Sequence, residues 1–442
     1  MDKIIERKVY TDNIKGFIGK DVVKIITGIR RCGKSEILKL VRQEALKVTD
    51  KEHIIFINFE DSEFDDIVSY KELNQYIAGK MKDEKKYYLF LDEIQTVENW
   101  EKAVNSLRLK NTDIYVTGSN SQLLSGELAT LLSGRYVQFE IKPLSFKEFL
   151  YFRKENELAP FYYGADLSAE KIIKRIDNNE IEFSGKPGED LAYFTTGKYY
   201  FDDYFLLGGF PVISTQGFGV EQAVQIVKDI HSSIVLKDVV LYNKIKNVAL
   251  LEKIVAYFYD NVGNLTSLRG IAEYISGGDK KKTAVNLETL GNYVSYLESA
   301  YIIKKAPRYD IKGKKLFETN DKYYLADHSL AYVVKDINKV NKGAVLENIV
   351  YKELVSRGYN VYVGKFDTKE VDFVAEKNGE KLYIQVCLEF TTEDTYKREV
   401  APLKEIKDNY PKYVVSLDNF ASRNDDGIIG ISLKDFLLKE AF

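Results

Sequence analysis

Residues Gly28-Ile29-Arg30-Arg31-Cys32-Gly33-Lys34-Ser35 decide how this chain of 442 residues is interpreted. The octet has the spacing of a phosphate-binding loop, in which glycines turn backbone N–H groups toward phosphates and a following helix adds its positive dipole end. The segment before it, 22–27, is largely apolar and β-branched, and residues 36–48 carry apolar side chains at helical spacing. Strand, loop and helix therefore predict a nucleoside triphosphate site with ATP and Mg²⁺ as cofactors. The expected nucleotide contacts are Gly28, Arg30, Arg31, Cys32, Gly33, Lys34 and Ser35.

A second strand, which ends in two acidic residues, is predicted at 87–93. These residues read Tyr-Tyr-Leu-Phe-Leu-Asp-Glu. A continuous apolar run indicates a strand buried on both faces of a parallel sheet, and ligands bind at the carboxyl edge of such sheets. Asp92 is expected to hold Mg²⁺ together with Ser35, and Glu93 to polarise the attacking water. The alternative is a solvated acidic pair at a strand end.

Two further polar groups follow the next strands. Residues 113–117 end in Gly118-Ser119-Asn120, so Asn120 or Ser119 is a candidate sensor of the γ-phosphate, although these residue types also form ordinary turns. Arg135 precedes the strand 136–141 and is a candidate arginine finger. A finger acting on a neighbour's nucleotide requires a homo-oligomer, whereas the alternative is a surface arginine paired with a carboxylate.

The alternation of strands and helices predicts an α/β fold. Strands at 53–59, 87–91, 113–117 and 136–141 alternate with helices that begin near Glu36, Tyr70 and Asn99. This pattern is typical of a doubly wound parallel sheet.

These motifs, with the following segment 142–149, resemble the prokaryotic AAA-type ATPases that carry a carboxy-terminal nuclease-like domain. The resemblance extends to Leu207-Gly208-Gly209-Phe210-Pro211, to residues 234–241 and to Asp260-Asn261-Val262-Gly263. It implies an ATP-binding and ATP-hydrolysing protein that depends on Mg²⁺. The polar stretch 159–199 does not share the resemblance and is expected to be an insertion.

The expected organisation has four parts, in keeping with the chain's length. They are an AAA-type core at 1–150, a helical lid or linker at 151–245, a winged helix-turn-helix at 246–330 and a small restriction-endonuclease-like α/β domain at 331–442.

Composition narrows the class of protein. Neither the 45% of hydrophobic residues nor the 30% of charged ones indicates disorder or a membrane protein, and no apolar run reaches the roughly 18 residues of a spanning helix. The amino terminus lacks a signal-peptide pattern, so a cytoplasmic location is expected. Two cysteines and three scattered histidines predict no disulfide framework and no zinc site. Cys32 is either a small tolerated loop residue or a thiol with a pKa lowered by the helix terminus and Lys34.

Residues 261–320 contain ten basic and six acidic residues, a net charge of +4 in a chain whose net charge is −3. Helices at 248–259, at 268–275 and from Thr283, followed by strands at 302–310 and 316–325, have the order of a winged helix-turn-helix. Leu287, Leu290, Val294 and Leu297 are expected to be buried, with Asn286, Thr289, Asn292 and Tyr296 facing outward. DNA is the expected partner of residues 261–320, and a protein contact is the alternative.

Near the carboxyl terminus, strands at 370–375 and 381–387 flank Asn378-Gly379, the strongest short hairpin signal. The resulting register places Asp372 across from Gln385, and Glu347 on the preceding helix is expected to reach it. This layout resembles PD-(D/E)XK nucleases.

The chain departs from the nuclease pattern where Gln385-Val386-Cys387 stands in place of acid-x-Lys. A neutral thiol cannot neutralise charge as a lysine does, so a degenerate nuclease fold is expected, in which Glu347 and Asp372 hold a metal weakly. An active DNA nuclease is the alternative. The sequence therefore leaves two function classes open: an ATPase coupled to DNA binding, and an ATP-gated switch or scaffold for a partner protein.

Overall fold

The computed structural model describes residues 4–124, 131–156, 158, 197–277, 285–316, 320–335, 339–390, 392–417 and 424–442. The chain consists of two compact units, which are described separately. Unit 1 comprises residues 1–142 with 299–301, and unit 2 comprises residues 143–298 with 302–442. Most of the expected insertion at 159–199 lies outside the described residues.

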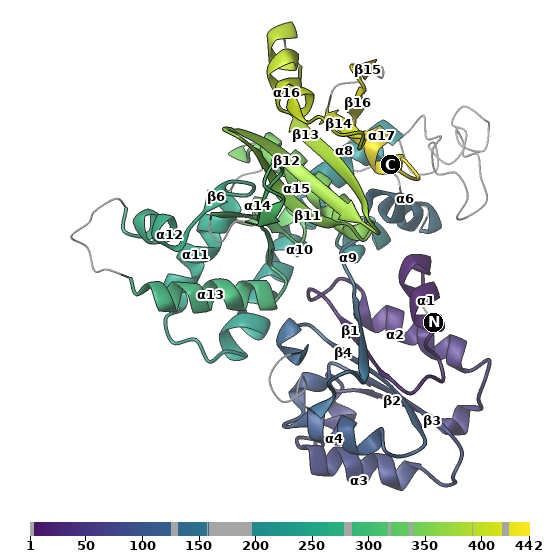
Figure 1. Cartoon of the computed structure of the whole chain (residues 1–442). Helices are drawn as coiled ribbons and strands as arrows, with labels where there is room; N and C mark the ends of the chain where they lie inside the picture. Colours follow the sequence, from purple (N-terminus) through teal and green to yellow (C-terminus); the bar gives the residue numbers. More distant parts are fainter. Residues whose placement is uncertain are drawn as a thin grey trace. The chain divides into compact units, whose positions relative to one another are not determined.

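Unit 1 is a parallel sheet flanked by helices (Figure 1). Its strands are β1 (Val23–Thr27), β2 (Ile54–Asn58), β3 (Tyr87–Asp92), β4 (Thr112–Gly118) and β5 (Tyr136–Glu140). They lie in the order β2-β3-β4-β1-β5, and every neighbouring pair is parallel. The predicted parallel α/β sheet is confirmed, with each strand within about two residues of its expected bounds.

The helices of unit 1 pack apolar faces on this sheet. They are α1 (Lys8–Lys15), α2 (Lys34–Ala45), α3 (Tyr70–Lys80) and α4 (Trp100–Leu107). At the amino end of α3, the Glu72 carboxylate accepts from the backbone N–H of Ser69 at 2.8 Å and from the Ser69 hydroxyl at 3.0 Å. Every residue of β1 and β3 is buried, as expected for strands covered on both faces.

One buried ion pair interrupts this apolar core. Lys24 on β1 bonds to Asp113 on β4, and both side chains are fully buried. Asp113 also accepts from the hydroxyl of Tyr115 at 3.0 Å and from the backbone N–H of Gly19 at 2.7 Å. Burial lowers the pKa of Lys24, and the charge of Asp113 offsets part of that effect. The pair therefore joins β1 and β4 inside the core.

Unit 2 begins with helices and a three-stranded antiparallel sheet. The helices are α6 (Phe146–Glu155), α8 (Gly197–Leu207), α9 (Pro211–Thr215), α10 (Val220–Ser233), a π-helix (Ile234–Leu241), α11 (Val248–Asp260), α12 (Leu268–Ile275) and α13 (Leu287–Ser299). The sheet has the order β6-β10-β7, from β6 (Leu265–Thr266), β7 (Ile303–Ala306) and β10 (Asp321–Leu325).

The rest of unit 2 is built on an eight-stranded sheet of order β15-β16-β14-β13-β12-β11-β8-β9. Its strands are β8 (Arg308–Asp310), β9 (Lys315–Leu316), β11 (Asn360–Phe366), β12 (Lys369–Lys377), β13 (Glu380–Cys387), β14 (Lys412–Ser416), β15 (Asn424–Asp425) and β16 (Ile428–Ser432). Helices α14 (Ala331–Val334), α15 (Lys342–Ser356), α16 (Glu393–Glu405) and α17 (Leu433–Leu438) accompany it.

The strands expected at 302–310 and 316–325 contribute two antiparallel pairs, β7 with β10 and β8 with β9. Only the β7 part of the first strand pairs with β10. Its remainder, β8, pairs in parallel with β11, so that Arg308 lies opposite Val363, and β9 continues the same large sheet. The turn at 312–314 between β8 and β9 is where the two expected strands were predicted to join, and β8 and β9 pair antiparallel around it. The sequence did not predict that β8 also pairs with β11.

The carboxy-terminal hairpin has the predicted register, with Lys377 paired to Glu380. Asn378 and Gly379 have φ angles of +52° and +87°. Positive φ at both central residues is the requirement of a type I′ turn, which explains why Asn-Gly sets the register locally.

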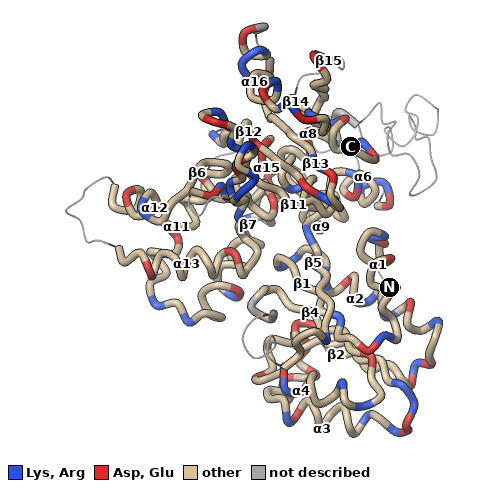
Figure 2. The backbone as a smooth tube through the Cα atoms, in the orientation of Figure 1, with Lys and Arg blue, Asp and Glu red and all other residues tan. Residues whose placement is uncertain are grey.

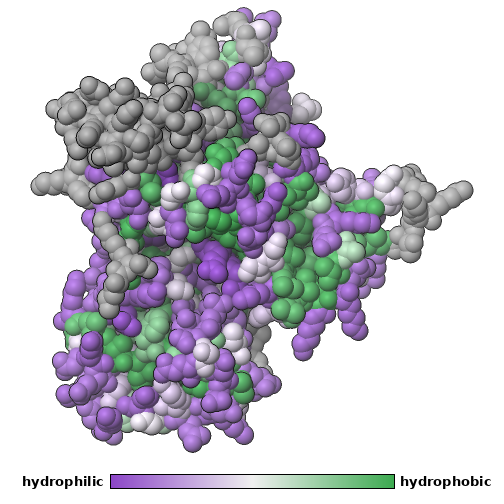
Figure 3. All heavy atoms as spheres, turned by 180° about the vertical axis from the view of Figure 1, so that it is seen from behind, coloured by the Kyte–Doolittle hydropathy of each residue, from purple (hydrophilic) through white to green (hydrophobic). Residues whose placement is uncertain are grey.

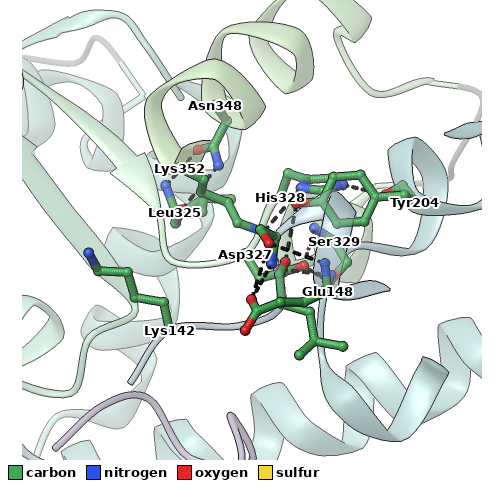
Figure 4. A network of polar contacts seen from close by, with 12 residues as sticks. Lys142, Glu148, Tyr204, Leu325, Asp327, His328, Ser329, Asn348 and Lys352 are labelled. Carbon is green, nitrogen blue, oxygen red and sulfur yellow. Dashed lines mark hydrogen bonds and ion pairs between the residues drawn. The ribbon is translucent and has the colours of Figure 1, made fainter. Parts of the chain in front are cut away.

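A buried polar network fastens unit 2 together around Asp327 (Figure 4). The carboxylate of Asp327 accepts from Lys352 on α15, from the hydroxyl of Ser329 at 2.6 Å and from the backbone N–H of Gly209 at 2.9 Å. His328 Nε2 lies 2.7 Å from the carbonyl of Tyr204 on α8. The network thus joins α8, the segment after β10 and α15.

Two details complete the fold. Leu287 is 41% exposed, contrary to its expected burial, because it stands in the first turn of α13, whereas Leu290, Val294 and Leu297 are buried as predicted. Within the described residues, none of the helices combines the length and apolar character that crossing a bilayer requires.

Candidate functional site

The octet loop folds as a tight turn at the carboxyl end of β1. Gly28 has φ +142° and lies so close to the neighbouring strand that a Cβ there would stand 2.0 Å from the carbonyl oxygen of Ile141. Gly33, the N-cap of α2, has φ +100°. Only glycine adopts both conformations without strain, which explains why the motif has glycine at these two positions.

Lys34 and Ser35 open α2 at the loop's end. The Lys34 ammonium donates to the carbonyls of Gly28 at 3.2 Å and Ile29 at 3.4 Å, and its Nζ lies 3.6 Å from Oε1 of Glu93. The lysine is thus held over the loop at the amino terminus of a helix, where anions bind.

Asp92 lies beside Ser35 at the end of β3. Its carboxylate accepts from the hydroxyl of Thr117 on β4 and is hydrogen-bonded to Ser35. Burial raises the pKa of Asp92, and these two hydroxyls offset part of the increase. A buried carboxylate beside a hydroxyl is the oxygen donor set that Mg²⁺ prefers.

Glu93 follows in the left-handed backbone region, with φ +55°. Its backbone N–H donates to the Thr117 hydroxyl at 2.9 Å, and its carboxylate accepts from the amide of Gln95. Burial by itself raises the pKa of Glu93, but the charges of Lys34 and Arg30 and the hydrogen bond from Gln95 together more than offset it, so the net shift is downward. Glu93 is therefore a buried carboxylate held in its charged form.

Ser119 and Asn120 come next along β4 and are both buried at the same edge of the sheet. The structure therefore brings together the predicted residues of the loop, the acidic strand and the polar strand end. Sequence reasoning missed Thr117 and Gln95, although both stand within three residues of a predicted group.

Arg7 is a further residue of this region that the sequence did not indicate. It is 4% exposed, and its guanidinium donates to the carbonyls of Cys32 at 3.0 Å and Lys142 at 2.9 Å. It therefore ties the octet loop to the segment that follows β5. No motif marks an arginine so far from the loop in sequence.

Cys32 is fully buried within the loop, where its thiol donates to the carbonyl of Ile141 at 3.2 Å. Burial raises the pKa of this thiol, and the charges of Lys34 and Arg7 only reduce the increase. The hypothesis of a low-pKa, reactive thiol is wrong, because desolvation outweighs the nearby positive charges.

The two arginines of the octet loop differ in their exposure to solvent. Arg30 is buried and pairs with Glu60, with 3.0 Å between Nη1 and Oε1. Arg31 is exposed and has φ +67°.

Arg135 lies at the amino end of β5, where its carbonyl accepts from the N–H of Val23 at the start of β1. The octet loop follows the carboxyl end of β1, so Arg135 and the loop stand at opposite edges of one parallel sheet. The exposed Arg135 lines a small pocket with Lys20 and Arg108. The structure therefore does not bring Arg135 to the nucleotide site of its own chain.

In unit 2, Glu347 and Asp372 lie close together, as expected, but a lysine stands between them. Lys322 Nζ is 3.1 Å from Glu347 Oε1, 3.8 Å from Asp372 Oδ1 and 2.7 Å from Glu370 Oε1. Burial raises the pKa of Asp372, and the negative charge of Glu347 raises it further. Burial alone would lower the pKa of Lys322, but the three carboxylates together raise it.

Gln385 is opposite Asp372, as predicted, and its side-chain oxygen accepts from the Asp372 backbone N–H at 3.3 Å. Among the described residues, no group of three or more His, Cys, Asp or Glu side chains has a geometry that could hold a metal ion. Sequence reasoning missed Lys322 because it lies on β10, outside the nuclease-like segment.

Comparisons with known proteins divide the chain into three regions. Residues 20–150 match the model of an AAA domain. Residues 198–341 and 342–436 match two domains of unknown function, DUF8612 and DUF4143.

Full-length relatives are also found. An uncharacterised protein of Haemophilus influenzae is 36% identical over 99% of both chains. An uncharacterised protein of Methanocaldococcus jannaschii is 30% identical, over 98% of this chain and 92% of its own length.

Among solved structures, the Walker-type ATPase of Pyrococcus abyssi is similar with a TM-score of 0.42 and 16% identity, covering 74% of this chain and 95% of that one. The RuvB Holliday junction branch migration motor of Thermotoga maritima has a TM-score of 0.29 and 13% identity, covering 68% of this chain and 87% of that one.

Proposed function

Because this chain belongs to the same family as the Haemophilus influenzae and Methanocaldococcus jannaschii proteins and carries an AAA domain, we propose that it hydrolyses ATP with Mg²⁺ to control DNA binding. The observation that carries the ATPase part is the convergence of Lys34, Ser35, Asp92 and Glu93 at one sheet edge.

Each of these groups has a role in the proposed reaction. The loop N–H groups and Lys34 bind the β- and γ-phosphates, and Ser35 and Asp92 would hold Mg²⁺. The metal, when bound, neutralises negative charge on the phosphate oxygens. Glu93 orients and polarises the attacking water, and the Thr117 hydroxyl positions both acids by bonding to Asp92 and to the Glu93 backbone. Buried Asn120 senses the γ-phosphate from the neighbouring strand.

We also propose that Arg135 acts in trans, which requires a homo-oligomer. Its place at the edge opposite the octet loop supports this role. Mixing Arg135→Ala with Glu93→Gln tests it, because a mixed oligomer contains sites that combine an intact Glu93 with a neighbour's Arg135. Recovery of ATP turnover on mixing supports the arginine finger. A mixture that is no more active than the two variants measured separately contradicts it.

The proposed DNA binding is supported by the order α11-β6-α12-α13-β7-β10 and by the sheet order β6-β10-β7, which resemble a winged helix-turn-helix. Exposed Lys312, Lys314 and Lys315 lie on the segment between β7 and β10. They are proposed to contact phosphates.

The carboxy-terminal part is proposed to be a degenerate nuclease-like domain. The order α15-β11-β12-β13-α16-β14, with β14 parallel to β13, supports the PD-(D/E)XK resemblance. The absence of a lysine at Cys387 argues against cleavage.

The test is steady-state ATP hydrolysis with and without double-stranded DNA, alongside DNA binding over a range of salt concentrations. Replacing Lys312, Lys314 and Lys315 with alanine should weaken binding and reduce its salt dependence. Replacing the exposed Lys51, Lys71 and Lys85 of unit 1 is the charge-matched control. Equal loss of DNA affinity in both triple variants would contradict this function. ATP turnover that does not change when DNA is added would contradict it as well.

A second candidate is an ATP-gated switch that binds a partner protein. Helix α13, which corresponds to the last helix expected for the winged module, contains no Lys or Arg (Figure 2). Apolar side chains also reach the surface in this part of unit 2 (Figure 3), and exposed members include Leu265, Leu268, Tyr274 and Leu287. Slow turnover unaffected by DNA, with capture of a protein lost in Leu287→Ser, would favour this candidate.

A further inference from the structure

The strongest unexplained feature of unit 2 is a lysine enclosed by three carboxylates. Lys322 comes from β10, Glu347 from α15, and Glu370 and Asp372 from β12. The Lys322 side chain is only 5% exposed, and its ammonium lies within 4 Å of an oxygen of each acid. A buried ammonium is costly unless it is paired, so these acids are the reason that Lys322 can be buried.

The cluster is also closed from the side of the helical region. The Tyr324 hydroxyl donates to Glu347 Oε1 at 2.6 Å. Gly263, in the turn after α11, lies against the same carboxylate, and a Cβ on Gly263 would stand 2.9 Å from Glu347 Oε1. The Gly263 N–H donates to the Tyr323 carbonyl at 3.1 Å, which fixes this turn to β10. Access to Glu347 is therefore restricted by two segments of the proposed winged module.

The ammonium stands where a divalent cation would have to bind. Glu347 and Asp372 are the acids that match the nuclease pattern, and Lys322 bonds or lies close to both. The other oxygen of Asp372 accepts from the Val386 N–H at 2.8 Å. A metal bound at about 2.0 to 2.3 Å from both acids would face the charged ammonium, which lies within 4 Å of the same oxygens.

We infer that Lys322 is the resident cation of this carboxylate cluster and replaces the divalent metal that a nuclease of this fold would hold. The cluster then joins the proposed winged module to the carboxy-terminal sheet and cuts no nucleic acid. Removing the ammonium while keeping the acids should uncover a site for an oxygen-preferring divalent cation such as Mn²⁺. The inference uses the nuclease-like part of the proposed function but not ATP hydrolysis, so the two can fail separately.

Mn²⁺ binding to the full-length chain tests this inference, measured by electron paramagnetic resonance without nucleotide. Every protein carries Asp92→Asn, which removes the proposed metal ligand of unit 1. Against this background, Lys322→Met should bind one Mn²⁺ at least tenfold more tightly than Lys322-containing protein. Adding Asp372→Asn to Lys322→Met should abolish the gain. Failure of a folded Lys322→Met protein to gain Mn²⁺ would overturn the inference.

Two measurements keep the test decisive if Lys322→Met folds poorly. Mn²⁺ should raise the melting temperature of Lys322→Met but not of the double variant with Asp372→Asn, a rescue that loss of packing alone would not produce. The Lys322-containing protein is informative by itself. Mn²⁺ binding that disappears with Asp372→Asn, or metal-dependent nicking of DNA that disappears with it, would show that Lys322 does not exclude the metal.

Discussion

The Nζ of Lys34 lies 3.6 Å from Oε1 of Glu93, and both side chains are almost fully buried. The pair connects the lysine proposed to bind phosphate, at the start of α2, with the proposed base, which follows β3. Bound triphosphate would compete for the same ammonium, so nucleotide binding is expected to release Glu93 toward water.

We expect Lys34→Ala to abolish detectable ATP binding, because the phosphates lose their one buried ammonium at the loop. Glu93→Gln should keep ATP binding and lower turnover by about 100-fold or more, since the amide cannot accept a proton. Isothermal titration and steady-state hydrolysis measure the two effects. Exposed Glu98→Gln is the matched control and should leave both unchanged. Normal turnover in Glu93→Gln would remove Glu93 from the proposed role.

Thiol reactivity should distinguish the chain's two cysteines. Cys32 is fully buried with a raised pKa, whereas Cys387 is partly exposed. Ellman's reagent should therefore modify one thiol quickly in the native protein, and the second only after unfolding in urea. Cys387→Ala should remove the fast phase, and Cys32→Ala should keep it. A fast phase that survives in Cys387→Ala would show that the loop opens.

Gly208→Ala should destabilise unit 2 strongly. Gly208 has φ +76°, and a Cβ there would stand 1.8 Å from Oδ1 of buried Asp327. The backbone strain and the displaced carboxylate together should lower the free energy of unfolding by about 3 kcal/mol, measured by urea denaturation. Gly379→Ala is the control, because Gly379 has φ +87° but no atom near its Cβ position. Gly379→Ala should lower the free energy of unfolding by about 1 kcal/mol. Equal losses of stability in Gly208→Ala and Gly379→Ala would show that the contact with Asp327 does not contribute.

Two histidines, half-buried His231 and buried His328, should destabilise the folded protein at acid pH. Burial lowers the pKa of His231 and of His328 to about 4, from an ordinary value of 6.5. Below pH 6.5 the two imidazoles bind protons in the unfolded chain but not in the folded one, so their contribution to stability is complete above that pH and falls as pH decreases to about 4. The slope should reach about 1.4 kcal/mol per pH unit for each histidine. The pKa of Asp327 is lowered to about 2 from 3.8, so Asp327 adds to the loss of stability only at the acid end of this window.

His231→Gln tests this pH dependence. The variant should lose less stability than the wild type between pH 7 and about pH 5, as followed by the midpoint of urea denaturation. The imidazole Nδ1 lies 2.9 Å from the Tyr259 hydroxyl, and the amide can retain a hydrogen bond there. An unchanged pH profile would show that His231 is not the source of the sensitivity.

Local patterns predicted much of this fold. The octet loop, the apolar run ending in Asp92 and Glu93, and the alternation of elements predicted a parallel sheet with polar groups at one edge, because each signal lies within a few consecutive residues. Asn378-Gly379 likewise set the register of its hairpin through the turn itself. The apolar face of α13 was predicted except at Leu287, the first residue of the helix. Helical spacing gives the buried face but not the residue at which burial begins.

By itself, the sequence determined the nucleotide-site motif, the class of fold and the hairpin register, since these depend on backbone preferences and periodicity between near neighbours. Only the tertiary structure decided that Arg7 holds the octet loop, that β8 joins β11, and that Lys322 stands among Glu347, Glu370 and Asp372. Those contacts join residues that are far apart along the chain. Their free energy comes from burying charges and backbone groups with partners on other elements, which no local pattern records.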